Sequence, residues 1–246
     1  MPVTLYAVHG SHPSQTVARA LELKGIAYRT IELPPGAHAA IMKLRFGRRT
    51  VPGVVFESGE KVVGSRPILR RLDQMAPEPA LLPADATARA RVLEAERWGD
   101  EVLQAAARRI FWPTLLANPG AAPSFSRGAR LPLPAPVARA AIPLVGRIEL
   151  RLNHTSDDAR AADLQALGGW LQQIDDWLAD GTLGGEEPNA ADLQIAPSLR
   201  LLMSMEDLRA IIGPRPCGAW ADGLFPDTAG RIPAGAIPAA ALPTGV

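Results

Sequence analysis

The stretch VTLYAVHGSHPSQTVARALELKGIAYRTIEL, residues 3–33, contains the patterns of two strands with a helix between them. Residues 3–8 are a short apolar run typical of a buried strand, and residues 28–33 alternate as a second strand does. Between them, apolar residues recur at helical spacing, and Gly25 stands where the end of a helix favours glycine. The stretch therefore predicts a βαβ unit with a right-handed crossover.

The next segment extends this unit into a small α/β domain. Residues 39–46 are typical of a short helix. The stretch TVPGVVFESGEKVVGSRPILRRLDQM, residues 50–75, predicts two strands joined by a Ser-Gly turn, followed by a helix with Ser65 as its N-cap. Three prolines punctuate residues 76–86, which we interpret as a linker. We therefore expect residues 1–78 to form an N-terminal α/β domain.

Residues 86–246 are predicted to form an all-α domain. Residues 86–112 have a helix-forming composition, and residues 157–179 place leucine and isoleucine at steps of three and four. Residues 190–205 are apolar almost all round, which predicts a central, buried helix.

Two segments of this second domain lack a regular pattern. Residues 113–136 are rich in proline and glycine, and the tail from Pro226 reads as irregular. Long irregular segments in compact domains are usually functional or disordered, so we expect a mobile rim or lid over a binding site. Trp112 and Phe125 flank or lie within the first segment, where they either belong to the core or wall an apolar cleft.

Composition excludes several functional classes. Of 246 residues, 47% are hydrophobic, and the formal net charge of +1 gives no basic surface for nucleic acid. No long apolar run or secretory leader is evident, which predicts a soluble, cytoplasmic protein with no membrane partner. The single cysteine, Cys217, excludes an internal disulfide and reads as a small buried residue. His9 and His12 lack a third ligand at motif spacing, so we expect no metal.

The turn between the first strand and the first helix contains two hydroxyl side chains, Ser11 and Ser14. A serine at this point can simply cap the helix, which is worth ~1 kcal/mol. Alternatively, its hydroxyl can donate a hydrogen bond to a ligand. The residues alone leave both interpretations open for Ser11 and favour the structural one for Ser14.

Three stretches together resemble the cytosolic glutathione transferase family. LYAVHGSHPSQTVARALELKGIAY resembles its first strand, active-site turn and helix, and TVPGVV with GEKVVGSRPILRRL resembles its cis-proline strand and glutathione-binding turn. GGEEPNAADLQIAPSL resembles the start of a helix in its second domain, where Asn189 and Asp192 also have the spacing of a capping box. The resemblance covers most of the chain and implies a thioredoxin-like domain followed by a helical domain.

The resemblance also implies a reaction and a set of site residues. Ser11 would activate the sulfur of glutathione, the co-substrate, for attack on an apolar electrophile, and the protein would be a homodimer. Glutathione would be bound by Thr50, Val51, Pro52, Gly64, Ser65 and Arg66, and the electrophile by His12, Trp112 and Phe125. The bond before Pro52 would be cis.

The sequence departs from the family at one position and leaves alternatives open. Gly64 stands where the family usually has an acidic residue or glutamine, which removes a partner for the α-amino group of glutathione. Either another side chain replaces it or the thiol is a different one. Tyr6 is a second candidate for thiol activation. An isomerase, dehalogenase or etherase of the same family, or a non-catalytic binding or scaffold protein of this fold, remains an alternative.

Overall fold

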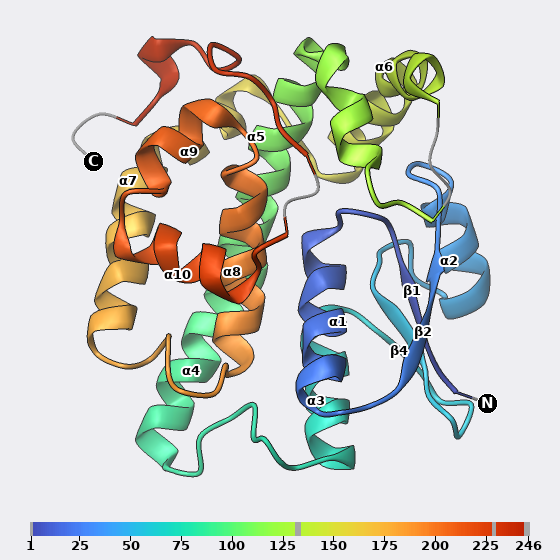
Figure 1. Cartoon of the computed structure of the whole chain (residues 1–246), viewed down its shortest axis with the longest axis vertical. Helices are drawn as coiled ribbons and strands as arrows, with labels where there is room; N and C mark the ends of the chain where they lie inside the picture. Colours follow the sequence, from blue (N-terminus) through green and yellow to red (C-terminus); the bar gives the residue numbers. More distant parts are fainter. Residues whose placement is uncertain (1, 131–133, 228–229, 244–246) are drawn as a thin grey trace.

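A four-stranded mixed sheet forms the N-terminal part of the chain (Figure 1). The computed structural model describes residues 2–130, 134–227 and 230–243. The strands lie in the order β2-β1-β3-β4, with β1 parallel to β2 and antiparallel to β3, and β3 antiparallel to β4. Their bounds are β1 Val3–Ala7, β2 Tyr28–Glu32, β3 Gly53–Val55 and β4 Lys61–Val63. The predicted βαβ unit and the following two strands are thus confirmed.

Helices cover both faces of the sheet (Figure 1). They are α1 (His12–Leu23), α2 (His38–Phe46) and α3 (Ser65–Met75). Because side chains alternate along a strand, Leu5 of β1 joins the large core cluster together with Val17 of α1 and Leu69 of α3. Tyr6 points to the opposite face and packs with Met42 of α2.

Helices make up nearly all the regular structure that follows. They are α4 (Ala86–Trp98), a π-helical turn (Gly99–Leu103), α5 (Gln104–Ala117), a 3-10 helix (Pro119–Ser126), α6 (Ala135–Leu152), α7 (Asp157–Ala179), α8 (Ala190–Leu202), α9 (Glu206–Ile212), α10 (Pro216–Leu224) and a 3-10 turn (Ala239–Ala241). This confirms the predicted architecture of an α/β domain followed by a helical one. In the part of the chain described, no helix is long and apolar enough to cross a membrane.

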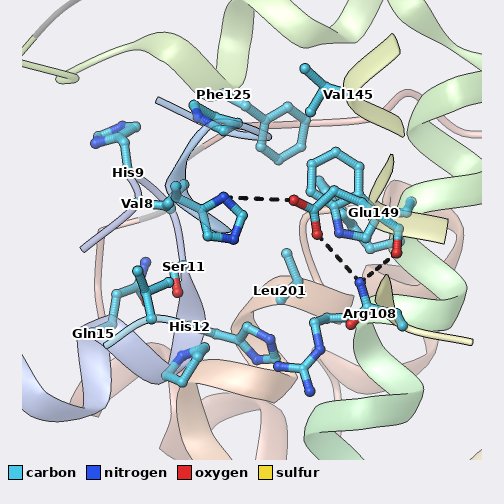
Figure 2. A pocket seen from close by; sticks show the side chains of 18 of the residues that line it. Val8, His9, Ser11, His12, Gln15, Arg108, Phe125, Val145, Glu149 and Leu201 are labelled. Atoms are coloured by element: carbon cyan, nitrogen blue, oxygen red, sulfur yellow. Dashed lines mark hydrogen bonds and ion pairs between the residues drawn. The ribbon is translucent and has the colours of Figure 1, made fainter. Parts of the chain in front are cut away.

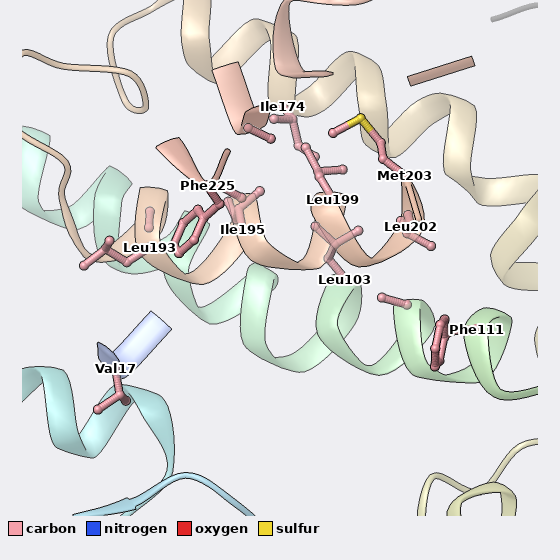
Figure 3. Packing of buried hydrophobic residues seen from close by; sticks show 14 of the residues in the cluster. Val17, Leu103, Phe111, Ile174, Leu193, Ile195, Leu199, Leu202, Met203 and Phe225 are labelled. Atoms are coloured by element: carbon pink, nitrogen blue, oxygen red, sulfur yellow. The ribbon is translucent and has the colours of Figure 1, made fainter. Parts of the chain in front are cut away.

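Helix α8 lies at the centre of the helical part, as predicted. Its side chains are buried on all sides, and it packs against α1, α4, α5 and α10 (Figure 3). The hydroxyl of Thr16 in α1 donates to the carbonyl of Leu193 in α8 at 2.7 Å, which ties the two parts of the molecule together. At the π-helical turn, Gly99 allows a close approach, since a Cβ there would lie 2.7 Å from Ile195 Cγ1.

The prediction that residues 113–136 are irregular is wrong for most of that segment. Helix α5 continues through Pro113 to Ala117, a 3-10 helix follows, and α6 begins at Ala135. Pro113 removes the backbone donor that would pair with the carbonyl of Arg109, and the helix nevertheless continues for four more residues. Residues 131–133 lie outside the described residues.

The linker and the tail are irregular, as predicted, but both are fixed by contacts. In the linker, Leu81 is buried and its N–H donates to Asp73 Oδ1 at 3.0 Å. In the tail, Ile232 and Ile237 are fully buried, and Ile232 pairs with Met205 in an isolated β-bridge. This part of the tail is therefore packed into the core rather than forming a free rim; residues 228–229 and 244–246 lie outside the described residues.

Candidate active site

A cavity of about 540 Å³ lies between the sheet domain and the helical domain (Figure 2). One wall consists of the turn between β1 and α1, the loop before β3 and the start of α3. The other wall consists of α5, the following 3-10 helix, α6 and α8. Of the predicted site residues, all except Arg66 border this cavity: Ser11, His12, Thr50, Val51, Pro52, Gly64, Ser65, Trp112 and Phe125.

Ser11 is the N-cap residue of α1, but its side chain does not cap the helix. Its backbone is extended (φ −67°, ψ 111°), and its hydroxyl makes no hydrogen bond to the first turn. Instead, the hydroxyl of Ser14 donates to Ser11 Oγ at 3.0 Å. Ser14 is buried and does not border the cavity. The hydroxyl hydrogen of Ser11 is therefore left to donate to a group in the cavity, close to the partial positive charge of the helix N-terminus.

The loop before β3 presents backbone groups to the cavity. The Val51–Pro52 peptide is cis, as expected, and the Pro52 carbonyl accepts a hydrogen bond from the Gly64 N–H at 2.9 Å. This bond joins the loop to the start of α3. Among the described residues, neither the N–H nor the C=O of Val51 has a hydrogen-bond partner. Both groups are thus able to pair with an extended ligand.

At the start of α3, the prediction that Ser65 is the N-cap is wrong by one residue. The N-cap is Gly64, and Ser65 is the first helical residue, with its side chain buried at the edge of the cavity. Gly64 has φ +93°, a backbone conformation that residues with a Cβ rarely adopt. Local backbone geometry therefore accounts for glycine at this position. The N–H groups of the first turn of α3 favour an anion.

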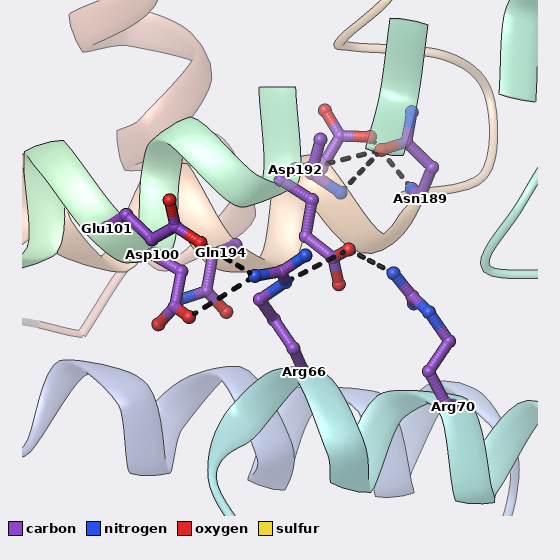
Figure 4. Close-up of polar contacts among 9 residues, drawn as sticks. Arg66, Arg70, Asp100, Glu101, Asn189, Asp192 and Gln194 are labelled. Atoms are coloured by element: carbon purple, nitrogen blue, oxygen red, sulfur yellow. Dashed lines mark hydrogen bonds and ion pairs between the residues drawn. The ribbon is translucent and has the colours of Figure 1, made fainter. Parts of the chain in front are cut away.

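Arg66 has protein carboxylates as partners and does not border the cavity (Figure 4). Its guanidinium lies 3.3 Å from Glu101, 3.6 Å from Glu96 and 3.8 Å from Asp100. Arg70, one turn further along α3, also pairs with the buried Glu96. These contacts join α3 to α4 and the π-helical turn, so the structure gives Arg66 a role in holding the two domains together.

The two histidines of the turn have separate partners. His12 is buried, and its Nδ1 lies 3.0 Å from Ser198 Oγ in α8, while its Nε2 has no hydrogen-bond partner. Burial lowers the pKa of His12 well below its usual value, and the nearby cation Arg108 lowers the pKa further. His9 Nε2 lies 2.8 Å from the Arg127 carbonyl. Within the described residues, no cluster of three or more His, Cys, Asp or Glu side chains could hold a metal ion.

Aromatic and aliphatic side chains form the wall opposite the turn (Figure 2). Phe111 contacts Trp112 and Phe125 edge to face, with ring centroids 5.3 and 5.1 Å apart. Ile142 and Val145 of α6 complete this surface. Sequence reasoning found Trp112 and Phe125 but not Phe111 or the α6 residues. The wall suits the apolar body of a small molecule.

Several polar residues of the cavity escaped sequence reasoning. Arg108 donates to Gln104 Oε1 at 2.8 Å, one turn away on α5. Glu149 of α6 lies 3.9 Å from His38 of α2, and burial raises the pKa of Glu149 and lowers that of His38. Helical spacing was the available signal for α5, since Gln104, Arg108, Phe111 and Leu115 fall at steps of four, three and four.

The other candidate for thiol activation, Tyr6, does not border the cavity. It is buried in the second core cluster, edge to face with Phe46 at 5.1 Å, and the Arg45 guanidinium lies 5.0 Å from the centre of its ring. Its surroundings are those of a core residue.

The comparisons with known proteins agree with this architecture. Residues 5–80 match the family described as glutathione S-transferase, N-terminal domain. This match identifies residues 5–80 as a glutathione S-transferase N-terminal domain, and solved glutathione S-transferase structures share the fold of the whole chain. A comparison with curated protein sequences found no match.

Solved structures of the same fold come from enzymes of several kinds. The β-etherase LigF from Sphingobium sp. strain SYK-6 is 18% identical, with a TM-score of 0.66 over 93% of this chain and 97% of that one. A glutathione S-transferase from Methylobacterium radiotolerans, in complex with glutathione sulfonate, is 18% identical, with a TM-score of 0.64 over 95% and 97%. A bacterial zeta-class maleyl pyruvate isomerase is 19% identical, with a TM-score of 0.55 over 89% and 90%. At these identities the likeness concerns the fold alone.

Proposed function

We propose that the protein activates the sulfur of glutathione, or of a related small thiol, for attack on an apolar electrophile. The observation that carries the proposal is the Ser11 hydroxyl, which borders the cavity, caps no backbone group and accepts a hydrogen bond from Ser14. A free thiol has a pKa of ~8.5, so only a few per cent is thiolate at neutral pH. A hydrogen bond from Ser11, together with the N-terminus of α1, stabilises the thiolate and increases that fraction.

The thiol substrate would lie along the sheet-domain wall. The unpaired backbone groups of Val51 pair with the peptide backbone of the ligand, and the start of α3 at Ser65 receives its γ-glutamyl carboxylate. Thr50, Pro52 and Gly64 shape the same wall. The side chain of Arg66 supports this wall through its ion pairs rather than by contact with the ligand.

The electrophile would lie against the helical-domain wall. Trp112 and Phe125 contact its apolar body, and His12, neutral at pH 7, lies beside the reacting sulfur. Other chemistry that starts from the same thiolate, such as isomerisation, dehalogenation or ether cleavage, fits this arrangement equally, and the fold relatives include an etherase and an isomerase. The proposal includes a homodimer in the cytoplasm, as the family resemblance implies.

A non-catalytic scaffold is the second candidate, favoured by Gly64, which offers no side chain to the α-amino group of glutathione. A thermal-shift panel of small thiols addresses binding first. A ligand at 100 times its dissociation constant stabilises a protein by about 2.7 kcal/mol. Thiol binding without turnover of any electrophile in a broad panel would favour the scaffold.

Ser11→Ala tests the mechanism itself. We expect the pKa of the bound thiol to rise and turnover to fall by ~10²-fold, the scale for loss of one preorganised donor, with thiol affinity changed only a few-fold. Tyr6→Phe is the control for the second candidate hydroxyl and should leave the thiol pKa unchanged. Full activity of Ser11→Ala, combined with loss of activity in Tyr6→Phe, would refute the assignment.

A further inference from the structure

Arg108 places a positive charge in the wall of the cavity, which Arg49 and Arg200 also border. It borders the cavity from α5, and its one side-chain hydrogen bond among the described residues goes to the neutral amide of Gln104 at 2.8 Å. Its Nε is buried without a hydrogen-bond partner. In the part of the chain described, no carboxylate lies within ion-pair distance of this guanidinium, whereas the adjacent Arg109 is paired with Asp163 at 2.7 Å.

The two carboxylates that face Arg108 are held by other groups. Asp100 accepts a hydrogen bond from Gln194 Nε2 at 3.2 Å and lies 3.8 Å from Arg66, and Glu149 Oε2 accepts a hydrogen bond from Asn153 Nδ2 at 3.4 Å. Burial raises the pKa of both carboxyl groups. The charge of the guanidinium is therefore not neutralised by direct contact with the protein.

The position of Arg108 relative to the other walls defines the shape of a ligand. Its guanidinium extends from α5 toward His12, the residue next to Ser11 (Figure 2). Phe111 and Trp112 follow Arg108 along the same helix and form the apolar surface. A molecule whose reactive carbon faces Ser11 and whose body lies on the aromatic wall can reach Arg108 with a polar end.

We propose that Arg108 binds a carboxylate of the electrophilic substrate, so that the substrate class is apolar unsaturated or aromatic acids. A guanidinium binds a carboxylate through two parallel N–H···O bonds, which also fix its orientation. Because Arg108 is partly buried in the cavity wall, such a pair discriminates against a neutral analogue that leaves the cation unpaired. This inference rests on the proposed function, because only that function makes the bound acid a substrate. The test below measures the binding of the acid alone.

The experiment compares the binding of an unreactive acid, 3-phenylpropionate, with that of its methyl ester by calorimetry, in the absence of thiol. The wild-type protein should bind the acid more tightly. Arg108→Gln should weaken binding of the acid by about 10- to 100-fold and leave the ester nearly unchanged, the scale for loss of a charge-assisted hydrogen bond. Arg108→Lys keeps the positive charge but not the two parallel N–H donors of the guanidinium. Its affinity for the acid should lie between those of the wild-type protein and Arg108→Gln.

Two further variants separate this role from general effects of charge or folding. Arg97→Gln removes a cation from the exposed surface of α4 and should leave both affinities unchanged. Arg108→Met keeps an apolar stem without a charge, and should reproduce Arg108→Gln if the latter folds poorly. Equal affinity of the wild-type protein for acid and ester, or equal weakening of both by the Arg108 variants, would overturn the inference.

The outcome is independent of thiol chemistry. If Arg108 instead served only to stabilise the thiolate, Arg108→Gln would raise the pKa of the bound thiol and leave the affinity for the acid intact, which would overturn the inference. If Ser11→Ala were fully active while acid binding still depended on Arg108, the proposed function would fail and the anion site would stand.

Discussion

Replacing Asp192 with alanine removes a carboxylate that accepts hydrogen bonds from two backbone N–H groups just before α8. Its Oδ1 accepts a hydrogen bond from the Gly184 N–H at 2.7 Å, and its Oδ2 accepts one from the Asn189 N–H at 2.8 Å. Asp192 is only 1% exposed, so in the alanine variant both donors would be left buried without acceptors. Each buried N–H donor without an acceptor lowers the free energy of unfolding by ~1–3 kcal/mol, so we expect a total loss of about 4 kcal/mol.

Asp85 provides a control at the surface, because it is the N-cap of α4 and also accepts a hydrogen bond from a backbone N–H at a helix start. Its Oδ1 accepts from the Ala88 N–H at 2.8 Å, but the residue is exposed and water can replace the carboxylate. We expect Asp85→Ala to cost ~1 kcal/mol. At roughly 2–4 °C per kcal/mol for a chain of this size, Asp192→Ala should lower the melting temperature by about 8–16 °C and Asp85→Ala by about 2–4 °C.

Urea unfolding measures both variants against the wild-type protein. A shift of the midpoint at constant slope reports a change in the free energy of unfolding. If Asp192→Ala and Asp85→Ala shift the midpoint equally, water or a relaxed backbone satisfies the two donors, and the reasoning from burial is refuted.

Three further measurements test other parts of the structure. Burial, with Asp175 adjacent, raises the pKa of Cys217 to about 12, so a thiol-specific reagent should modify Cys217 only after unfolding; modification of the native protein at the unfolded rate would contradict this. Burial lowers the pKa of His12, so the stability of the folded protein that depends on neutral His12 is fully present above the unfolded pKa of about 6.5 and is lost as the pH falls. His12→Gln should therefore flatten the decline in melting temperature between about pH 7.5 and about pH 5.5. An unchanged decline would contradict this prediction. Ser65→Ala should weaken thiol binding by about 10-fold with little change in turnover at saturation, and unchanged affinity would remove Ser65 from the binding site.

Local patterns were sufficient to predict the sheet domain and the long helices α7 and α8, but not α6, α9 or α10. Strand and helix periodicities over residues 3–33 identify the βαβ unit because its determinants lie within the segment itself. The capping box of Asn189 and Asp192 was predicted for the same reason, and the structure contains both of its reciprocal hydrogen bonds. The sequence prediction ended this helix at residue 112, before Pro113, whereas α5 continues to Ala117 and packs against α6, α7 and α8, and such packing is not encoded in local composition.

The residues of the candidate site also differ in whether they could be predicted from the sequence. The sheet-domain wall, including Ser11 and Ser65, follows the order of residues along the chain and could be predicted from short motifs. The cation Arg108 could not, because its importance depends on where α5 packs and on which carboxylates remain out of reach. For Arg66 the motif predicted a contact with glutathione. In the structure, its guanidinium instead lies within 4 Å of three carboxylates on α4 and the π-helical turn.

The cavity is bordered by residues as far apart along the chain as Val8 and Asp227. A ribosome releases the Ser11 turn early, and the sheet domain can fold before the helical domain has been made. Until α5, α6 and α8 have emerged, the turn therefore faces bulk water with no opposite wall. An enclosed site exists only after residue 227 has left the ribosome, so an incomplete nascent chain can carry the serine but cannot enclose a ligand beside it.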